Sequence, residues 1–197
     1  MKTNGKEDPR VRRTRELLLQ AFTDILMDKG FHHLTIQDIA ERAGVNRVTF
    51  YGHFSDKYAI LEYWLREQFQ QQVVSQCPVT ENLSMNNLET LIVTMMRWFA
   101  RLHNLARPDD QQLLPLLFTT MPQELSRLLT SWFKHAPGIE LPSHLTPEVV
   151  LMAMSWTIFG TSFEWSDGLR TLTPEQQARQ VTTLLFAGLD ANHPKIG

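Results

Sequence analysis

The side chains best suited to chemistry lie in residues 35–57, which read T-I-Q-D-I-A-E-R-A-G-V-N-R-V-T-F-Y-G-H-F-S-D-K. The pattern predicts two short helices joined by an Ala-Gly turn, and the chemistry that such a pair performs is recognition of DNA. The second helix, residues 47–54, has an exposed first turn, as a helix that enters the major groove requires. The segment therefore predicts a helix-turn-helix that binds double-stranded DNA.

Local signals mark where these two helices begin and end. Thr35 can cap the first helix, and Asp38 three residues later suits both the reciprocal cap and the positive end of the helix dipole. Gly44 ends that helix, because glycine enters the left-handed conformation without steric cost. Asn46 then caps the second helix. The apolar face of the first helix follows the helical spacing i, i+3, i+4, i+7: Ile36, Ile39, Ala40 and Ala43.

The charge of the chain is uneven although its sum is small. The chain has 197 residues and a formal net charge of -2. Residues 1–60 hold 10 Lys/Arg and 8 Asp/Glu, whereas residues 61–197 hold 9 and 13. A basic front end on an acidic remainder suits a protein that presents one face to phosphates. Six basic residues lie within the first 15: Lys2, Lys6, Arg10, Arg12, Arg13 and Arg15.

Several classes of site and location are disfavoured by composition. Cys77 is the single cysteine, so no intrachain disulfide can form, which fits a reducing cytoplasm and leaves its role open. The N-terminus is too polar for a signal peptide, and the apolar run 149–163 is shorter than the roughly 20 residues of a membrane span. The histidines have no metal-site spacing, and no catalytic motif is present. We therefore expect a cytoplasmic protein with no membrane association, no metal, no cofactor and no catalytic residues.

The whole chain has the pattern of helices and loops, which predicts an all-α fold. A first helix begins at Asp8-Pro9 and ends at Gly30. Ser55 is expected to cap a long fourth helix that ends at Pro78. Pro108 is expected to open a sixth helix that Pro115 kinks or cuts, because an internal proline removes a backbone donor, and a seventh helix is expected around Leu125 to Phe133. The last two helices are predicted near 147–165 and 174–188.

The first 65 or so residues resemble the TetR family of bacterial transcriptional regulators. The resemblance rests on T-I-Q-D-I-A-E-R-A-G-V-N and T-F-Y-G-H-F-S-D-K, preceded by a basic helix and G-F-H-H-L. It implies a three-helix helix-turn-helix domain followed by a larger helical domain that binds a ligand and dimerises. The implied boundaries are a flexible N-terminus at 1–8, the DNA-binding domain at 9–55, the effector-binding and dimerisation domain at 56–189, and a tail at 190–197.

The resemblance also assigns roles within the DNA-binding segment. Arg47 and Val48 match positions near base edges, where Arg47 can fork onto guanine and Val48 can meet a thymine methyl group. The hydroxyl groups of Thr49 and Tyr51 and the ammonium group of Lys57 match phosphate contacts. His53 either contacts phosphate or packs at the helix end. Arg10, Arg12 and Arg13 either reach adjacent phosphates or are simply solvated. The assigned DNA-binding residues are Thr35, Asn46, Arg47, Val48, Thr49, Tyr51, His53 and Lys57.

For the larger domain the resemblance implies an apolar effector cavity and a two-fold interface between the last two helices of each copy. The candidate pocket residues could equally form plain core, because Met and aromatic residues at helical spacing usually do. They are Met95, Trp98, His103, Phe118, Trp132, Trp156 and Phe159. The candidate dimer contacts are Ala153, Gly160, Leu184, Leu185 and Gly188.

The predicted function is a homodimeric repressor that binds a near-palindromic operator and is released by a small apolar or amphipathic effector. Two other classes stay open. One is a helix-turn-helix regulator with no small-molecule effector, controlled by a protein partner or by abundance. The other is an enzyme whose C-terminal half brings ionisable groups together through space. The effector, the operator sequence and the regulated genes have no signature in the sequence.

Overall fold

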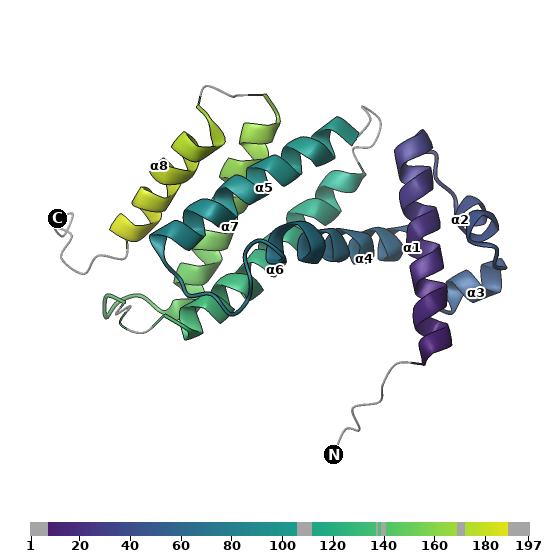
Figure 1. Cartoon of the computed structure of the whole chain (residues 1–197), viewed down its shortest axis with the longest axis horizontal. Coiled ribbons are helices and arrows are strands. Elements are labelled where there is room, and N and C mark those ends of the chain that lie inside the picture. Colours follow the sequence, from purple (N-terminus) through teal and green to yellow (C-terminus); the bar gives the residue numbers. More distant parts are fainter. Residues whose placement is uncertain (1–7, 106–111, 137, 139–140, 169–171, 189–197) are drawn as a thin grey trace, which may run out of the picture. The chain divides into compact units, whose positions relative to one another are not determined.

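In the computed structural model, which describes residues 8–105, 112–136, 138, 141–168 and 172–188, every regular element is a helix (Figure 1). The all-α fold class is thus confirmed. The α-helices and one π-helix, η1, are α1 (Pro9–Lys29), α2 (Ile36–Ala43), α3 (Arg47–Tyr51), α4 (Lys57–Phe69), η1 (Gln70–Val74), α5 (Met85–Leu105), α6 (Leu113–Lys134), α7 (Pro147–Ser166) and α8 (Pro174–Ala187).

The chain folds into two compact units. Unit 1 is built from Met1–Trp64 and Leu105–Leu116, and unit 2 from Leu65–Asn104 and Leu117–Gly197. Three helices contribute residues to both units, because α4 is divided after Trp64, α5 after Asn104 and α6 after Leu116.

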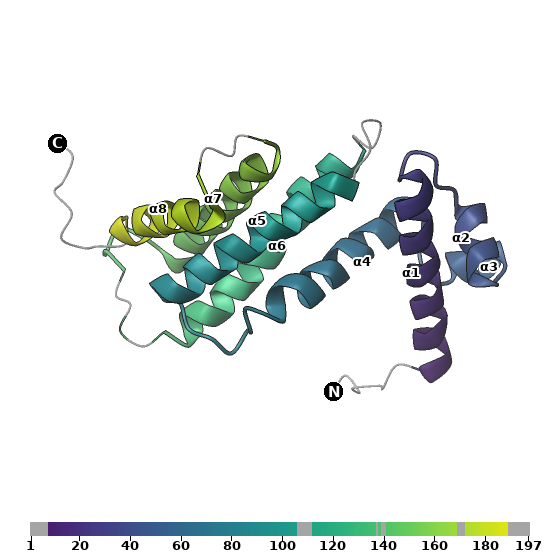
Figure 2. The same ribbon diagram turned by 45° about the horizontal axis from the view of Figure 1, so that its top comes forward.

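Unit 1 is a small helical domain in which α2 and α3 lie beside α1 (Figures 1 and 2). Its core contains Phe22 and Phe31, both fully buried, with ring centroids 6.4 Å apart. Trp64 of α4 joins this core, since its ring lies 6.1 Å from Phe22 and its indole N–H donates to Thr23 Oγ1 at 3.0 Å. The aromatic packing therefore fixes the start of α4 on the α1 side of the domain.

Unit 2 is a bundle of α5, α6, α7 and α8 with the end of α4. Its core is tied to the polar loop before α5 by Trp132, which is fully buried. The indole N–H of Trp132 donates to Pro78 O at 2.7 Å, and its carbonyl accepts from Leu83 N at 3.1 Å. The loop residues 78–83 therefore pack against the C-terminal part of α6.

The prediction of separate sixth and seventh helices is wrong, because one helix, α6, runs from Leu113 to Lys134 and Pro115 does not cut it. Pro115 is the third residue of α6, where a backbone N–H has no intrahelical acceptor, so the missing donor costs nothing. The proline inside the helix is Pro122, which is buried. Pro108, expected to open a helix, lies outside the described residues.

The expected limits of the fourth helix also need correction. Asp56 rather than Ser55 caps α4, since its carboxylate accepts from the backbone N–H groups of Tyr58 and Ala59 at 2.8 Å. The helix does not continue to Pro78, because α4 passes into η1, which ends at Val74. In the described part of the chain no helix is both long and apolar enough to cross a membrane.

Candidate DNA-binding surface

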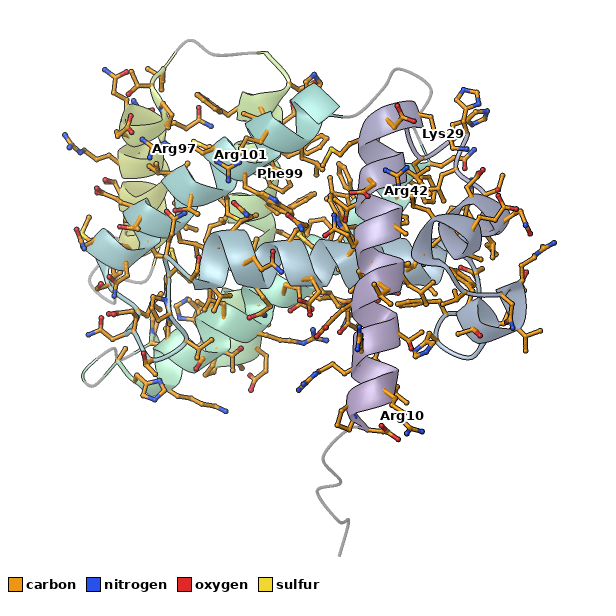
Figure 3. The ribbon with its side chains drawn as sticks, turned by 45° about the vertical axis from the view of Figure 1, so that its right-hand side comes forward. Arg10, Lys29, Arg42, Arg97, Phe99 and Arg101 are labelled. Atoms are coloured by element: carbon orange, nitrogen blue, oxygen red, sulfur yellow. The ribbon has the colours of Figure 1, made fainter. Side chains whose placement is uncertain are left out.

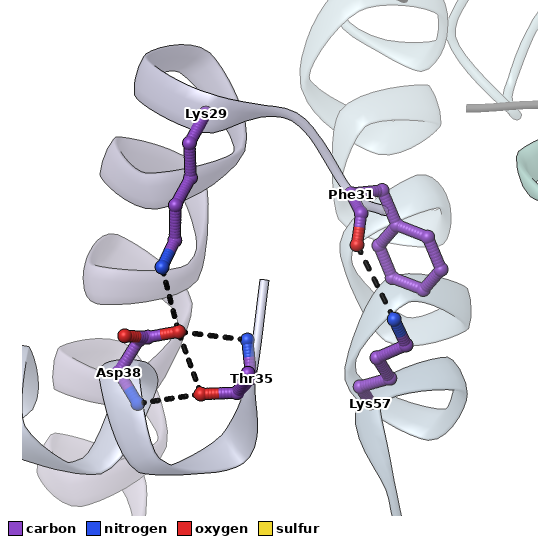
Figure 4. Close-up of polar contacts among 5 residues, drawn as sticks. All are labelled: Lys29, Phe31, Thr35, Asp38 and Lys57. Carbon is purple, nitrogen blue, oxygen red and sulfur yellow. Dashed lines mark hydrogen bonds and ion pairs between the residues drawn. The ribbon is translucent and has the colours of Figure 1, made fainter. Parts of the chain in front are cut away.

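The carboxylate of Asp38 joins the first helix of the helix-turn-helix, α2, to α1 (Figure 4). One of its oxygens, Oδ2, accepts from Lys29 Nζ at 2.7 Å, from Thr35 N at 2.9 Å and from Thr35 Oγ1 at 2.6 Å. In return Thr35 Oγ1 accepts from Asp38 N at 3.2 Å, which completes the predicted capping box. The hydrogen bond from Lys29 and those from Thr35 lower the pKa of Asp38 from 3.8 to about 2. The end of α1 and the start of α2 are thus joined at one atom.

The turn into α3 depends on Gly44, whose φ of 69° lies in the left-handed region that favours glycine. Its N–H donates to Glu41 O at 3.1 Å, and Val45 N donates to Ala40 O at 2.9 Å, so the last carbonyls of α2 are satisfied. Asn46 then caps α3, because its side-chain oxygen accepts from Thr49 N at 2.8 Å. The predicted turn and both predicted caps are therefore present.

The short helix α3 has one solvent-exposed face and one buried face. Phe50 is fully buried and Phe54 nearly so. On the opposite side Val48 is 79% exposed, Tyr51 is 51% exposed, and Arg47 is exposed as well. Arg47 has no carboxylate within ion-pair distance among the described residues. The exposed face of α3 therefore carries a guanidinium, an aliphatic side chain and a phenol that a binding partner can contact.

Two of the other assigned residues, Thr49 and Thr35, use their hydroxyl groups within the chain. Thr49 is half-buried, and its hydroxyl donates to Asn46 Oδ1 at 2.9 Å. The hydroxyl of Thr35 is part of the capping box. To contact DNA, these groups must accept further bonds or exchange their present ones. His53, half-buried just after α3, lies where it can shape the helix end.

Lys57 is folded back onto the turn between α1 and α2. Its Nζ lies 3.3 Å from Phe31 O and 4.6 Å from the centre of the Phe31 ring (Figure 4). A backbone carbonyl and the face of an aromatic ring both attract an ammonium group. Contact with a phosphate thus requires Lys57 to leave this site or to bridge the two groups.

The basic residues at the start of α1 are exposed. Arg10 lies at the N-terminal end of α1, at the opposite end from Lys29 (Figure 3). Arg12 pairs with Glu16 at 3.7 Å, but both side chains are about two-thirds exposed, so the pair holds Arg12 weakly. Arg13 is exposed too, which leaves all three available to a polyanion.

Sequence reasoning missed a cluster in unit 1 that joins distant residues. The side chain of Gln112, just before α6, accepts from Tyr58 Oη at 3.0 Å and lies 3.4 Å from His32 Nδ1. The ring of Tyr58 also packs on Phe31, with centroids 5.4 Å apart. No local pattern marks these contacts, since Gln112 is 80 residues from His32 along the chain.

Most candidate effector residues lie in the core of unit 2. Met95 and Trp132 are fully buried, while Trp98 and Phe159 are almost so. His103, in contrast, is exposed, and its Nδ1 lies 3.6 Å from Asp167 Oδ1. The two candidates that are partly exposed are Trp156 at 49% and Phe118 at 38%.

Phe118 and Trp156 form the outer edge of a group of aromatic rings, here called the aromatic cluster. Phe118 packs edge-on against Phe159 and Phe163, with centroids at 4.9 and 5.2 Å, and Trp156 packs against Phe159 at 6.0 Å. Phe99 of α5, labelled in Figure 3, closes the inner side at 5.6 Å from Phe159. The cluster consists of Phe99, Phe118, Trp156, Phe159 and Phe163.

The candidate dimer residues lie along the outer sides of α7 and α8. Ala153 and Gly188 are exposed and Gly160 is half-buried. Leu184 is 67% exposed, and Leu185 beside it is half-buried. Three large apolar residues on α7 are also about half exposed: Val149 at 51%, Met152 at 53% and Trp156 at 49%.

Cys77, the single cysteine, is buried. Burial raises the pKa of the Cys77 thiol to about 11, so the reactive thiolate is scarce at neutral pH. Within the described residues, no three His, Cys, Asp or Glu side chains gather as they do around a metal ion.

Comparison with known proteins places the helix-turn-helix in a family. Residues 18–63 match the sequence profile described as "Bacterial regulatory proteins, tetR family". An uncharacterised HTH-type transcriptional regulator of Bacillus subtilis, YxbF, is 43% identical over 56 residues, which are 28% of this chain and only 15% of that protein.

Solved structures extend the likeness of fold to nearly the whole chain. A TetR-family regulator from Streptomyces coelicolor has a TM-score of 0.63 at 17% identity, covering 94% of this chain and 99% of that one. FadR from Bacillus subtilis, solved in complex with stearoyl-CoA, has a TM-score of 0.50 at 18% identity, covering 89% and 99%. These relatives are transcriptional regulators, a class of protein that is not enzymatic.

The Asp38 junction predicts a pH dependence of stability. Because folding lowers the pKa of Asp38, its contribution is complete above about pH 4 and is lost as the pH falls towards about 2. Thermal unfolding of the wild type and of Asp38→Asn should therefore give melting temperatures that differ at pH 5 and converge towards pH 2. Lys29→Met should move this loss to higher pH, because the ammonium no longer favours the carboxylate. A difference that stays constant from pH 5 to pH 2 would contradict the assigned role.

Proposed function

Because this chain belongs to the TetR family of bacterial regulatory proteins, we propose that it is a cytoplasmic, homodimeric repressor that binds a near-palindromic operator and is released by a small apolar or amphipathic molecule. The observation that carries the DNA-binding part is the exposed face of α3, which combines Arg47, Val48 and Tyr51 on a capped and packed helix. Arginine can fork onto guanine, valine can meet a thymine methyl group, and a phenol can donate to phosphate.

The homodimer is supported by the apolar faces of α7 and α8. Three half-exposed large side chains on α7 (Val149, Met152 and Trp156) follow the helical spacing i, i+3, i+7, so they lie on one side of the helix. Such a stripe is costly in water and is stabilised when a second copy covers it. Two copies related by a two-fold axis would place two α3 helices for successive major grooves of a near-palindromic site.

Ligand-gated release is supported by the aromatic cluster in unit 2. It joins α5, α6 and α7 and reaches the surface at Phe118 and Trp156, so an apolar molecule could bind it by separating rings at that edge. The structurally similar FadR was solved with stearoyl-CoA, an amphipathic molecule. A ligand that prefers one arrangement of unit 2 could act on unit 1 through α4, whose backbone is continuous between them.

A regulator without a small-molecule effector is the alternative. Met95, Trp132 and Phe159 are at most 1% exposed, and the indole N–H of Trp132 is already bonded to Pro78 O. These residues have the properties of plain core. In this alternative, a protein partner or the abundance of the chain controls DNA binding.

The exposed face of α3 and Lys57 predict separable effects on DNA binding. With a duplex enriched by the wild type from a randomised pool, Arg47→Ala should relax the preference at a single base pair, at a cost of about 1–3 kcal/mol. Tyr51→Phe should weaken binding to all sequences equally, and Lys57→Ala should also reduce the salt slope by about 1. Arg97→Ala is the matched control, since Arg97 is an exposed arginine on α5 of unit 2 (Figure 3). Unchanged DNA binding in all three test variants would exclude α3 as the helix that contacts DNA.

The apolar stripe of Val149, Met152 and Trp156 on α7 predicts that a charge placed there weakens self-association. Met152→Glu should weaken self-association by about 3 kcal/mol, roughly 100-fold, because the carboxylate would be buried without a partner. Met85→Glu, on α5, is the matched control, since Met85 is 45% exposed and Met152 is 53% exposed. Sedimentation equilibrium measures both. Equal association constants for the two variants would exclude the α7 face as the interface.

The aromatic cluster predicts an allosteric ligand. Titration of the operator complex with apolar and amphipathic compounds, long-chain acyl-CoA among them, should find one that weakens DNA binding by roughly 5–150-fold. Phe118→Ala should reduce the affinity for that compound without altering DNA binding in its absence. Phe133→Ala, on the same helix but outside the cluster, should leave it unchanged. If compounds bind unit 2 with no effect on DNA affinity, the effector-free alternative holds.

A further inference from the structure

Gly52, the residue directly after α3, is a glycine that its own backbone does not require. Its φ of -70° and ψ of -16° are ordinary right-handed helical values, which any residue adopts. Gly44, at the other end of the turn, provides the contrast, because its φ of 69° favours glycine. The conformational freedom of glycine is thus used at Gly44 and left unused at Gly52.

Packing inside the protein does not require a glycine at this position either. A Cβ atom on Gly52 would lie 3.3 Å from Thr49 O and 3.7 Å from Val48 O, and apart from the two adjoining residues no other part of the described chain comes within 4 Å. The first distance is tight but involves only the preceding turn. Gly52 is exposed, and alanine is favoured over glycine in a helix by about 1 kcal/mol. A Cβ atom here thus needs a shift of a few tenths of an ångström against the preceding turn, but no neighbouring element stands in its way.

The position of Gly52 relative to Val48 suggests what the missing side chain permits. Gly52 N donates to Val48 O at 3.0 Å, so the two residues lie one helical turn apart on the same side of α3. Val48 is 79% exposed. This side therefore consists of one branched apolar side chain followed by bare backbone, and the N–H of Gly52 is already used within the helix. The Val48 side of α3 therefore has no side-chain group that can form a hydrogen bond with a base.

We propose that Gly52 determines DNA sequence specificity by allowing the Val48 side of α3 to approach the major groove closely enough to pack on a thymine methyl group. The C5-methyl group of thymine is the apolar feature of the major-groove edges, and an aliphatic side chain is its natural partner. A side chain at position 52 would hold this face away from the base pairs. The proposal rests on the proposed function, since it requires α3 to enter the groove of duplex DNA.

The test combines one protein variant with one change in the DNA. The probe is the duplex that the wild type enriches from a randomised pool, together with versions in which each thymine in turn is replaced by deoxyuridine, which lacks the methyl group. Gly52→Ala should bind the enriched duplex about tenfold or more weakly, within the range of one unfavourable base-pair contact. Its affinity for a random-sequence duplex should be unchanged, because phosphate contacts supply that affinity.

The deoxyuridine scan gives an independent readout on the unaltered protein. At one thymine or more, loss of the methyl group should weaken wild-type binding, and at that position Gly52→Ala and Val48→Ala should show little further loss. A thermal unfolding curve shows whether Gly52→Ala is folded; if it is not, the wild-type scan decides alone. Equal binding of the enriched duplex by folded Gly52→Ala and the wild type, or a scan with no sensitive thymine, overturns the proposal. A wild type that enriches no sequence overturns the proposed function itself.

Discussion

The DNA-binding unit depends on one carboxylate oxygen, Oδ2 of Asp38. It accepts from an ammonium group at the end of α1 and from the backbone and hydroxyl of Thr35 at the start of α2. Three donors converge favourably on one atom only when that atom carries negative charge, which is why the pKa of Asp38 falls to about 2. The bond from Lys29 is the one that crosses between helices. It converts a local helix cap into a constraint on the angle between α1 and α2.

The exposed face of α3, with Arg47, Val48 and Tyr51, depends for its position on that constraint. A helix of five residues such as α3 is not stable alone, so its direction is set by what precedes it and by the side it buries. Gly44 sets the turn and Asn46 starts the helix. Phe50, fully buried, then fixes the rotation of α3 about its own axis. Exposure of Arg47, Val48 and Tyr51 is therefore a consequence of packing on the other side.

The parts of the structure that the sequence predicts are those with short-range causes. The capping box of Thr35 and Asp38, the turn at Gly44 and the cap of Asn46 on Thr49 each act over at most three residues. Each also requires a recognisable residue type. Lys29 and Lys57 differ, because their partners are Asp38 and Phe31, nine and 26 residues away. Gln112 is more distant still from His32 and Tyr58.

The same distinction explains the error at α6 and the ambiguity in unit 2. A proline breaks a helix or fits into it according to its distance from the N-terminal end of the helix. Because α6 begins at Leu113, Pro115 lies in its first turn, and Pro122 is the proline inside the helix. For Met95 and Trp132 the sequence shows an apolar helical face but cannot separate core from pocket. The structure shows both fully buried, and the exposed edge of the aromatic cluster is a property of three helices together.

The anchoring of α4 constrains how any signal from unit 2 could reach DNA. The N-terminal part of α4 is fixed in unit 1 by Trp64, bonded to Thr23, and by Tyr63, whose ring lies 5.8 Å from Phe54. With these contacts intact, a displacement of the first part of α4 would be passed to α1 through Trp64 and to the end of α3 through Tyr63. Unit 1 would then move as one body, so the quantity that changes is the spacing of the two α3 helices in the proposed dimer. The geometry of each reading face, and with it the contact assigned to Val48 and Gly52, would be the same in the bound and released states.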